Sequence, residues 1–166
     1  MNKEEFTQRV LEAESSLYHV ALAASANKSD CEDAVQEAIL TAYEKLHTLR
    51  EEKYFKTWLT RILINTCFKM SRSRKNIVSF EDYMPDEAAG DDTELSEVRE
   101  AVMALPPKIR TAVVLYYIEG YSVDETAYMM RLPVGTVKSR LHKGRKMLKD
   151  TLGDTDIQEK REVYEK

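Results

Sequence analysis

The sequence predicts an all-α fold of two small helical domains, joined by an acidic flexible linker, with a helix-turn-helix in the C-terminal domain. Apolar residues recur at spacings of three and four through most of the 166 residues, and strand-like alternation is absent. The linker is indicated by the span 81–100, which holds nine acids, one base, a proline and a glycine. The stretch from Tyr121 to Leu148 has the pattern of two helices separated by a tight turn.

These patterns divide the chain into four parts. The N-terminal domain is predicted to cover residues 1–76 and the acidic linker residues 77–93. The C-terminal domain would then occupy residues 94–152, followed by a charged tail over residues 153–166. Because 43% of the residues are hydrophobic, the chain has enough apolar side chains for a small core in each domain.

Three helices are predicted in the N-terminal domain. The first runs from about Lys3 to Ala26, and the second from Asp30, its expected N-cap after a turn at 27–29, to about Leu46. The third covers about Tyr54 to Arg72. The residues expected to face the core are Phe6, Val10, Ala13, Leu17 and Ala21 in the first helix, Val35, Ile39, Ala42 and Leu46 in the second, and Phe55, Leu59, Ile62, Thr66 and Met70 in the third.

The C-terminal domain is predicted to begin with two helices. One runs from about Thr93 to Leu105, and Pro107 opens the next, which Gly120 closes as a C′ residue. The expected core residues are Leu95, Val98 and Val102, followed by Ile109, Val113, Val114, Tyr117 and Ile118.

The helix-turn-helix follows directly. Ser122 and Glu125 form a capping-box pattern that starts its first helix, and Pro133 breaks the chain before the second. The second helix is expected to bury Val134, Val137, Leu141, Gly144 and Leu148.

The second helix of this motif is strongly basic. Residues 131–149 contain seven lysines or arginines and no acid, although the whole chain carries a formal charge of −4. A solvated amphipathic helix is the plainer interpretation, but a basic second helix of a helix-turn-helix favours docking in the major groove of DNA.

The third helix carries a mixed aromatic and basic face. At about 100° per residue, six polar or aromatic side chains fall within an arc of about 80°. Rings interleaved with cations suit single-stranded nucleic acid, because rings stack on bases while cations follow the phosphates. The alternative places the tryptophan in the core and makes Arg61 a salt-bridge partner. The six residues are Tyr54, Trp58, Arg61, Asn65, Lys69 and Arg72, and Arg74 and Lys75 extend the basic run.

Other classes of function lack support in the sequence. There is no glycine-rich phosphate loop and no hydrolase or protease signature, so we expect no enzyme and no cofactor. Cys31 and Cys67 lack CxxC partners, which predicts free thiols and no metal site. No stretch is apolar enough for a signal peptide or membrane span, and the expected location is therefore the cytoplasm.

Taken together, the motifs resemble the ECF (extracytoplasmic function) sigma factors of bacterial RNA polymerase. DCEDAVQEAILTAYEKL is similar to the family pattern D-x-E-D-x-V-Q-E-x-F, and YFKTWLTRILINTCFKMSRSRK to its F-x-T-W-L-x-R-I-x-x-N segment. The C-terminal LPPKIRTAVVLYYIEGYSVDETAYMMRLPVGTVKSRLHKGRKML is similar to L-P-x-x-x-R…G-x-S-x-x-E-x-A-x-x-x-x-x-P-x-G-T-V-x-S-R. Ile39 departs from the usual phenylalanine, and the N-terminus is somewhat short before the first motif.

The resemblance implies a role for each surface. Core polymerase would be bound by Asp33, Gln36 and Glu37. Asn65 and the loop 47–53 would capture an unstacked base of the downstream promoter element, flanked by the other third-helix residues and the bases of 69–75. The upstream element would be contacted by Lys138, Ser139, His142 and Lys143 in the major groove, with Thr136, Arg140 and Arg145 as phosphate or packing positions.

The resemblance also implies the partners. They are core RNA polymerase, promoter DNA in duplex and melted form, and an anti-sigma factor, which in this family often lies in the membrane. Two other hypotheses remain: a dimeric helix-turn-helix repressor that binds a palindromic operator alone, and a regulator that sequesters a partner through its acidic linker and tail.

Overall fold

The structure, a computed structural model, describes residues 1–25, 27–73 and 93–153. These residues form helices and short helical turns with no strand, which confirms the predicted all-α class. Residue 26, nearly all of the predicted linker and the tail after residue 153 lie outside the described residues, and so do Arg74 and Lys75.

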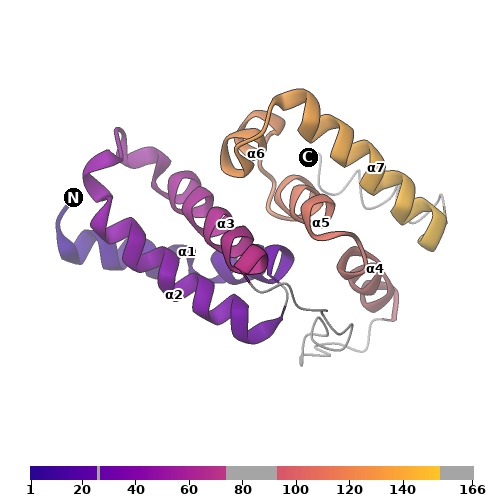
Figure 1. Ribbon diagram of the computed structural model, residues 1–166, viewed down its shortest axis with the longest axis horizontal. Helices are drawn as coiled ribbons and strands as arrows, with labels where there is room; N and C mark the ends of the chain where they lie inside the picture. The colour runs from indigo at the N-terminus through magenta and orange to yellow at the C-terminus, as the bar shows by residue number, and fades with distance from the viewer. Residues whose placement is uncertain (26, 74–92, 154–166) are drawn as a thin grey trace.

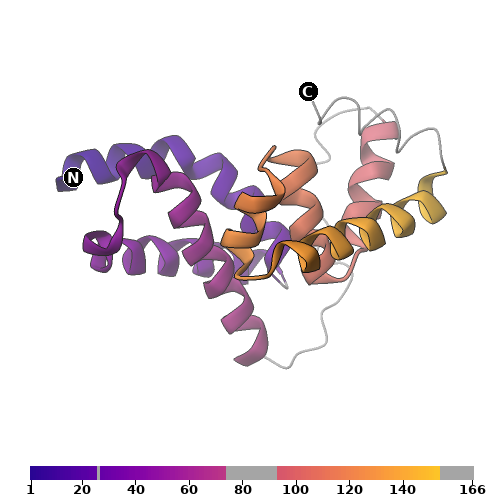
Figure 2. The ribbon, with the colours of Figure 1, turned by 90° about the horizontal axis from the view of Figure 1, so that it is seen from above.

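The helices form two groups that lie side by side (Figures 1 and 2). In each group the helices pack on one another, and α3 lies between α2 and the second group (Figure 1). The first group contains α1 (Lys3–Ala24), α2 (Lys28–Glu44), the 3-10 turns η1 (Leu46–Thr48) and η2 (Glu52–Tyr54), and α3 (Phe55–Ser73). The second contains α4 (Thr93–Met103), α5 (Pro107–Val113), the π-helical turn η4 (Val114–Ile118), α6 (Val123–Met130) and α7 (Val134–Leu152).

Side-chain caps define where two of these helices begin. The predicted capping box of α6 is confirmed: the Glu125 amide donates to Ser122 Oγ at 3.0 Å, and the Ser122 amide donates to Glu125 Oε1 at 3.0 Å. The predicted Asp30 cap of α2 is wrong. Asn27 is the N-cap, and its Oδ1 accepts from the Asp30 amide at 2.8 Å, because helical geometry begins at Lys28 and leaves that amide without an intrahelical partner.

A π-helical turn shifts the register after α5. The Glu119 amide donates to the Val114 carbonyl five residues earlier, at 2.9 Å. The wider turn changes the direction of the side chains at its end, so Ile118, predicted as core, is 42% exposed and Tyr117 is only half-buried. Gly120 then adopts a φ of +77°, which confirms its predicted role as the residue that ends this segment.

Two other predicted core residues lie at the surface. Leu95 is 48% exposed and Val134 is 36% exposed. Each lies in the first turn of its helix, where the 3.6-residue period gives the direction of a side chain but not how far along the helix a neighbour reaches. Six further predicted core positions are half-buried: Val10, Ile39, Leu46, Ile62, Met70 and Val98.

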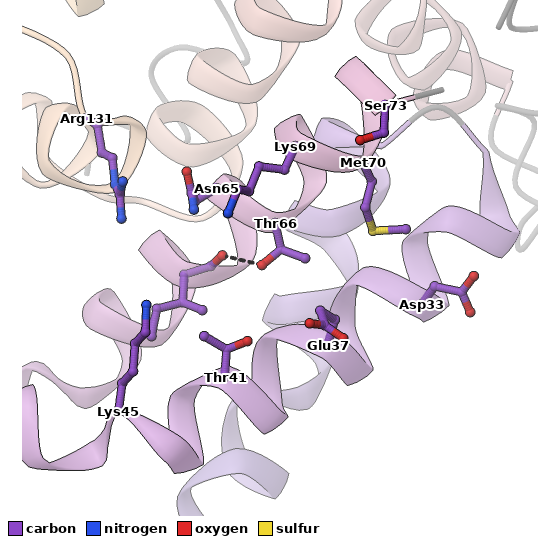
Figure 3. Close-up of a pocket in the computed structure, with 11 residues that line it drawn as sticks. Asp33, Glu37, Thr41, Lys45, Asn65, Thr66, Lys69, Met70, Ser73 and Arg131 are labelled. Atoms are coloured by element: carbon purple, nitrogen blue, oxygen red, sulfur yellow. Dashed lines mark hydrogen bonds between the residues drawn. The ribbon is translucent and has the colours of Figure 1, made fainter. Parts of the chain in front are cut away.

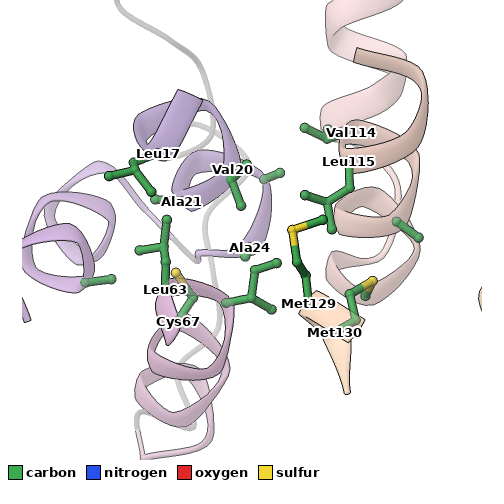
Figure 4. Close-up of a cluster of buried hydrophobic side chains, with 14 of the residues drawn as sticks. Leu17, Val20, Ala21, Ala24, Leu63, Cys67, Val114, Leu115, Met129 and Met130 are labelled. Carbon is green, nitrogen blue, oxygen red and sulfur yellow. The ribbon is translucent and has the colours of Figure 1, made fainter. Parts of the chain in front are cut away.

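The buried core is continuous between the two helix groups. Side chains of α1 and α3 face those of η4 and α6 across the contact (Figure 4). Val20 and Leu63 on one side, and Leu115 and Met129 on the other, are at most 1% exposed. Burial of such side chains stabilises the contact by about 2 kcal/mol each.

Gly144, predicted as buried, lets α7 approach α5. A Cβ atom at this position would lie 2.7 Å from Val113 Cγ2, closer than packed carbon atoms come. Helix α7 is therefore packed closely against α5 at this position.

Arg110 of α5 is the most buried charged residue in the described part of the chain, at 1% exposure. Its Nε donates to the Ala23 carbonyl at 2.6 Å, and one Nη donates to the Ser25 carbonyl at 3.3 Å. The other Nη donates to the Met103 and Leu105 carbonyls at 2.9 and 3.3 Å. The guanidinium thus binds the C-terminal end of α1, which has no basic residue in its last turn, to the α4–α5 connection.

The two cysteines are free and buried, as predicted. Burial raises the pKa of Cys31 to about 12 and that of Cys67 to about 11. The Ser25 hydroxyl lies 3.4 Å from Cys67 Sγ and lowers the pKa of Cys67 in part. Both thiols stay protonated at neutral pH and serve as small core side chains.

We predict that Arg110→Ala lowers the free energy of unfolding by about 3 kcal/mol, because buried carbonyls lose their donors and a cavity remains. Urea denaturation followed by circular dichroism measures the change. The matched control is Lys108→Ala, an exposed base on the same helix, which should change stability by less than about 0.5 kcal/mol. Equal stability of the two variants would show that the Arg110 contacts contribute little.

Candidate nucleic-acid interface

One exposed face of α7 carries four of the predicted duplex-contacting residues. We call Lys138, Ser139, His142 and Lys143 the α7 basic face; all four are exposed. Lys138 and His142 are four residues apart, as are Ser139 and Lys143, so the four side chains share one side of the helix. Val137 and Leu141 on the opposite side are buried and hold the helix against the domain.

The other three predicted α7 residues, Thr136, Arg140 and Arg145, are half-buried and lie partly against neighbouring parts of the protein. Arg145 donates from Nη1 to the Tyr117 hydroxyl at 2.9 Å. Burial lowers the pKa of Arg140, although an arginine remains charged under all ordinary conditions. Thr136 lies in the first turn of the helix, and its amide donates to the Pro133 carbonyl at 3.0 Å.

A basic groove of about 890 Å³ runs between the C-terminal end of α3 and α7. Its described lining includes four bases and no acid: Arg72, Lys108, Arg140 and Lys143. The structure therefore brings the end of the predicted single-strand face next to the predicted duplex-binding helix, a proximity that the sequence did not indicate.

The predicted α3 face is not uniformly exposed. Tyr54, in η2, is 55% exposed, and Lys69 and Arg72 are also exposed, whereas Trp58 is only 8% exposed. The Trp58 ring packs beside Phe55 at a centroid distance of 5.9 Å. In this arrangement Trp58 is therefore a core residue, because α6 also packs against α3 and widens its buried side.

Arg61 contacts the C-terminal helix group. Its guanidinium carbon lies 4.4 Å from the centroid of the Tyr128 ring on α6, a cation–π contact. The structure thus gives Arg61 an aromatic partner, where the sequence offered either a nucleic acid or a salt bridge.

A second groove, of about 550 Å³, lies between α2 and α3 (Figure 3). Asp33 and Glu37 line it from α2, and Asn65 and Lys69 from α3. Thr66 also lines it, and its hydroxyl donates to the Ile62 carbonyl at 2.8 Å. Two predicted polymerase-contacting acids therefore adjoin the predicted base-capturing asparagine.

Gln36, the third predicted polymerase contact, is exposed on α2 but does not line this groove. Four residues later, Leu40 is 63% exposed, the highest value among the large hydrophobic side chains that the structure describes. Sequence reasoning missed Leu40, although a signal was present: it falls outside the apolar series of Val35, Ile39 and Ala42.

One arginine near these grooves was also missed. Arg131, at the C-terminal end of α6, has a φ of +57° and lines the α2–α3 groove (Figure 3). Left-handed geometry at a non-glycine residue costs about 1 kcal/mol, so this turn carries strain. Arg50 lines a third groove with Tyr54 and Trp58. It was not missed, because it belongs to the loop 47–53 that the resemblance assigned to base capture. Only the folded chain shows that these side chains adjoin α3.

No three His, Cys, Asp or Glu side chains among the described residues are grouped so that they could hold a metal ion. No helix in residues 1–25, 27–73 or 93–153 has the length and apolar character needed to cross a membrane.

Comparison with known proteins relates both helix groups to one family. Residues 10–77 match the family model described as Sigma-70 region 2, and residues 95–148 match Sigma-70, region 4. We use the names region 2 for α1–α3 and region 4 for α4–α7.

Relatives align along most of the chain. The ECF RNA polymerase sigma factor SigW of Bacillus subtilis is 30% identical over 156 residues, which cover 83% of each chain. The ECF RNA polymerase sigma factor SigE of Mycolicibacterium smegmatis is 33% identical over 147 residues, which cover 82% of this chain and 57% of that longer protein.

The fold is also similar to a solved structure. The sigma factor RpoE of Bartonella quintana, crystallised with the anti-sigma factor NepR, has a TM-score of 0.79 and 25% identity. That match covers 92% of this chain and 99% of the other. On these sequence and structural grounds, the chain belongs to the ECF family of RNA polymerase sigma factors, which direct the polymerase to promoters.

Proposed function

We propose that this sigma factor divides promoter recognition among three surfaces. The α7 basic face contacts the upstream promoter element in duplex form, the α3 face contacts the melted strand, and the exposed side of α2 binds core RNA polymerase. The observation that carries this proposal is the α7 basic face itself, an exposed cationic surface on the second helix of a helix-turn-helix.

The chemistry of the α7 basic face suits the major groove. Lysine and histidine donate hydrogen bonds to guanine O6 and N7, while a serine hydroxyl both donates and accepts. Arg145 is held by Tyr117 and Arg140 is partly buried, so these two arginines fit positioning contacts to phosphates better than base reading. Sequence choice then rests with the four exposed residues.

We predict that Lys138→Ala with Lys143→Ala reduces transcription from the protein's own promoters by about 100-fold, because two major-groove contacts are lost. The measurement is run-off transcription of genomic fragments with core polymerase, with and without the protein. Wild type should produce discrete new start sites, and the variant should retain its affinity for core polymerase.

The control for that experiment replaces two other exposed bases with alanine, Lys3 on α1 and Arg99 on α4, so that net charge changes equally. It should leave the start sites intact. If the α7 variant initiates as well as this control, the α7 basic face does not select promoters. Specific binding to DNA by the protein alone, without transcripts, would favour a repressor.

Asn65 is the best placed residue for capturing an unpaired base. It is half-buried in the α2–α3 groove beside Lys69, so its amide is held near a cation that could neutralise a phosphate. An amide presents a donor and an acceptor together, which matches the edge of a base. The sigma factor would hold the strand while core polymerase carries out RNA synthesis.

We predict that Asn65→Ala weakens open-complex formation roughly tenfold and leaves closed-complex binding nearly unchanged, since unpaired bases exist only in the open complex. Permanganate footprinting measures the first and gel-shift of the polymerase complex at low temperature the second. Thr41→Ala, which alters the same groove from α2, is the control. An equal loss in both complexes would argue against base capture.

The polymerase-binding surface on α2 extends beyond its acids. Gln36 and Leu40 are four residues apart and therefore adjacent on the helix, and both are exposed. An exposed leucine beside polar residues is a frequent anchor of protein interfaces, where a few side chains supply most of the affinity. Leu40 accordingly joins Asp33, Gln36 and Glu37 in this surface.

We predict that Leu40→Asp weakens binding to core polymerase about 30-fold, because an interface anchor becomes a charge that must be desolvated. Fluorescence anisotropy titration with core polymerase measures the affinity. Leu11→Asp is the matched control, as Leu11 is 57% exposed on α1. Similar affinities for both variants would remove Leu40 from the interface.

We further infer that an anti-sigma factor holds this protein inactive in the bacterial cytoplasm. Support comes from the similarity to the Bartonella quintana sigma factor, whose structure contains such an inhibitor. The basic groove between α3 and α7 would suit an inhibitor segment that carries acidic side chains.

A further inference from the structure

Region 4 covers part of the α3 face. A groove of about 660 Å³ separates α6 from the start of α3 and the loop before it. Residues of both regions line it: Asp124, Glu125 and Tyr128 from α6, and Arg50, Tyr54, Trp58 and Arg61 from region 2. The side chains assigned to the melted strand therefore already face a neighbour within the same chain.

The α6 side of this groove has the chemistry of a nucleic-acid strand. Tyr128 offers a flat ring to the Arg61 guanidinium at 4.4 Å, as an unpaired base would. Asp124, one turn earlier on the same helix, adds a negative charge to the groove that Arg50 and Arg61 also line, as a phosphate would. The Glu125 carboxylate accepts from the Ser122 amide, and Glu51 is an acid on the region 2 side of the groove.

We propose that α6 is an internal mimic of the melted promoter strand and blocks the α3 face until region 4 moves away from region 2. This inference rests on the proposed contact between α3 and the strand. Because Tyr128 and a nucleobase would use the same guanidinium, both cannot occupy the groove together. The free sigma factor then has low affinity for single strands, and opening of the two regions creates the binding surface.

Contacts outside the groove hold the two regions together. The Ser16 hydroxyl donates to Glu119 Oε1 at 2.6 Å, joining α1 to the segment before α6. Lys56 lies over the Tyr121 ring, with Nζ 6.0 Å from the centroid. Residues on both sides of the groove are therefore fixed by contacts that do not involve the strand-binding side chains.

Trp58 is a built-in reporter of this contact. It is the sole tryptophan of the chain, it is 8% exposed, and it lines the groove opposite α6. Separation of the two regions would expose its ring to water, so quenching of tryptophan fluorescence by acrylamide measures opening without any DNA.

The test compares two variants of the full chain. Tyr128→Ala removes the ring of the mimic, and Ser16→Ala removes a closing contact outside the groove. We expect both to bind a fluorescein-labelled 12-nucleotide single strand of mixed sequence about fivefold more tightly than wild type, because loss of one contact shifts the opening equilibrium by about that factor. We expect the acrylamide quenching constant of both to exceed that of wild type. Ser16→Ala is essential, because Tyr128→Ala also exposes Trp58 locally.

Leu95→Ala, an exposed side chain on α4, is the control and should match wild type in both assays, while circular dichroism verifies that every variant is folded. Wild type that binds the strand as tightly as both variants would overturn the mimic and leave the α3 contact standing. Raised quenching with no strand binding by any variant would overturn the α3 assignment and the mimic with it. Quenching unchanged in Ser16→Ala would show that this hydrogen bond does not hold α6 in place, and would also count against the proposal.

Discussion

The buried guanidinium of Arg110 is the interaction on which the arrangement of the two regions depends. It donates to carbonyls at the end of α1 and to carbonyls of the α4–α5 connection, so one side chain satisfies acceptors in both regions. A buried charge is tolerated only when such partners surround it. Moving region 4 away would expose this charge and the α1 carbonyls to water, which can replace the lost hydrogen bonds.

The contact between the two regions therefore combines apolar burial with polar interactions that water can replace. The apolar residues at the contact, such as Leu115 and Met129, favour closure through burial. The polar contacts of Arg110, Ser16 and Arg61 orient the two regions relative to each other, and water can replace their hydrogen bonds when the regions separate. A domain contact of mixed character is typical of units that must separate during function.

The three proposed binding surfaces are affected differently by this arrangement. The α7 basic face and the exposed side of α2 are open, whereas the α3 face lies partly beneath α6. Binding of duplex DNA and of polymerase could therefore precede access to the melted strand. Such an order would suit a factor that must avoid single-stranded nucleic acid before it reaches a promoter.

The sequence by itself determined the helical class, the caps at Ser122 and Glu125, and the family, because these depend on local spacing and on residue types in a fixed order. The resemblance assigned Lys138, Ser139, His142 and Lys143 to contact with duplex DNA, and the regular helix α7 exposes all four on one side. Predictions failed where the helix was not regular, as at Ile118 within the π-helical turn, or where burial depended on a neighbouring segment, as at Leu95.

Only the tertiary structure decided what faces α3. The cation–π contact of Arg61 with Tyr128 and the hydrogen bonds of Arg110 to Ala23 and Ser25 join residues more than forty positions apart. Helical periodicity gives the face on which a side chain lies but carries no information about which distant segment will cover it. That pairing is set by the packing of the two regions, and with it the accessibility of the proposed strand-binding surface.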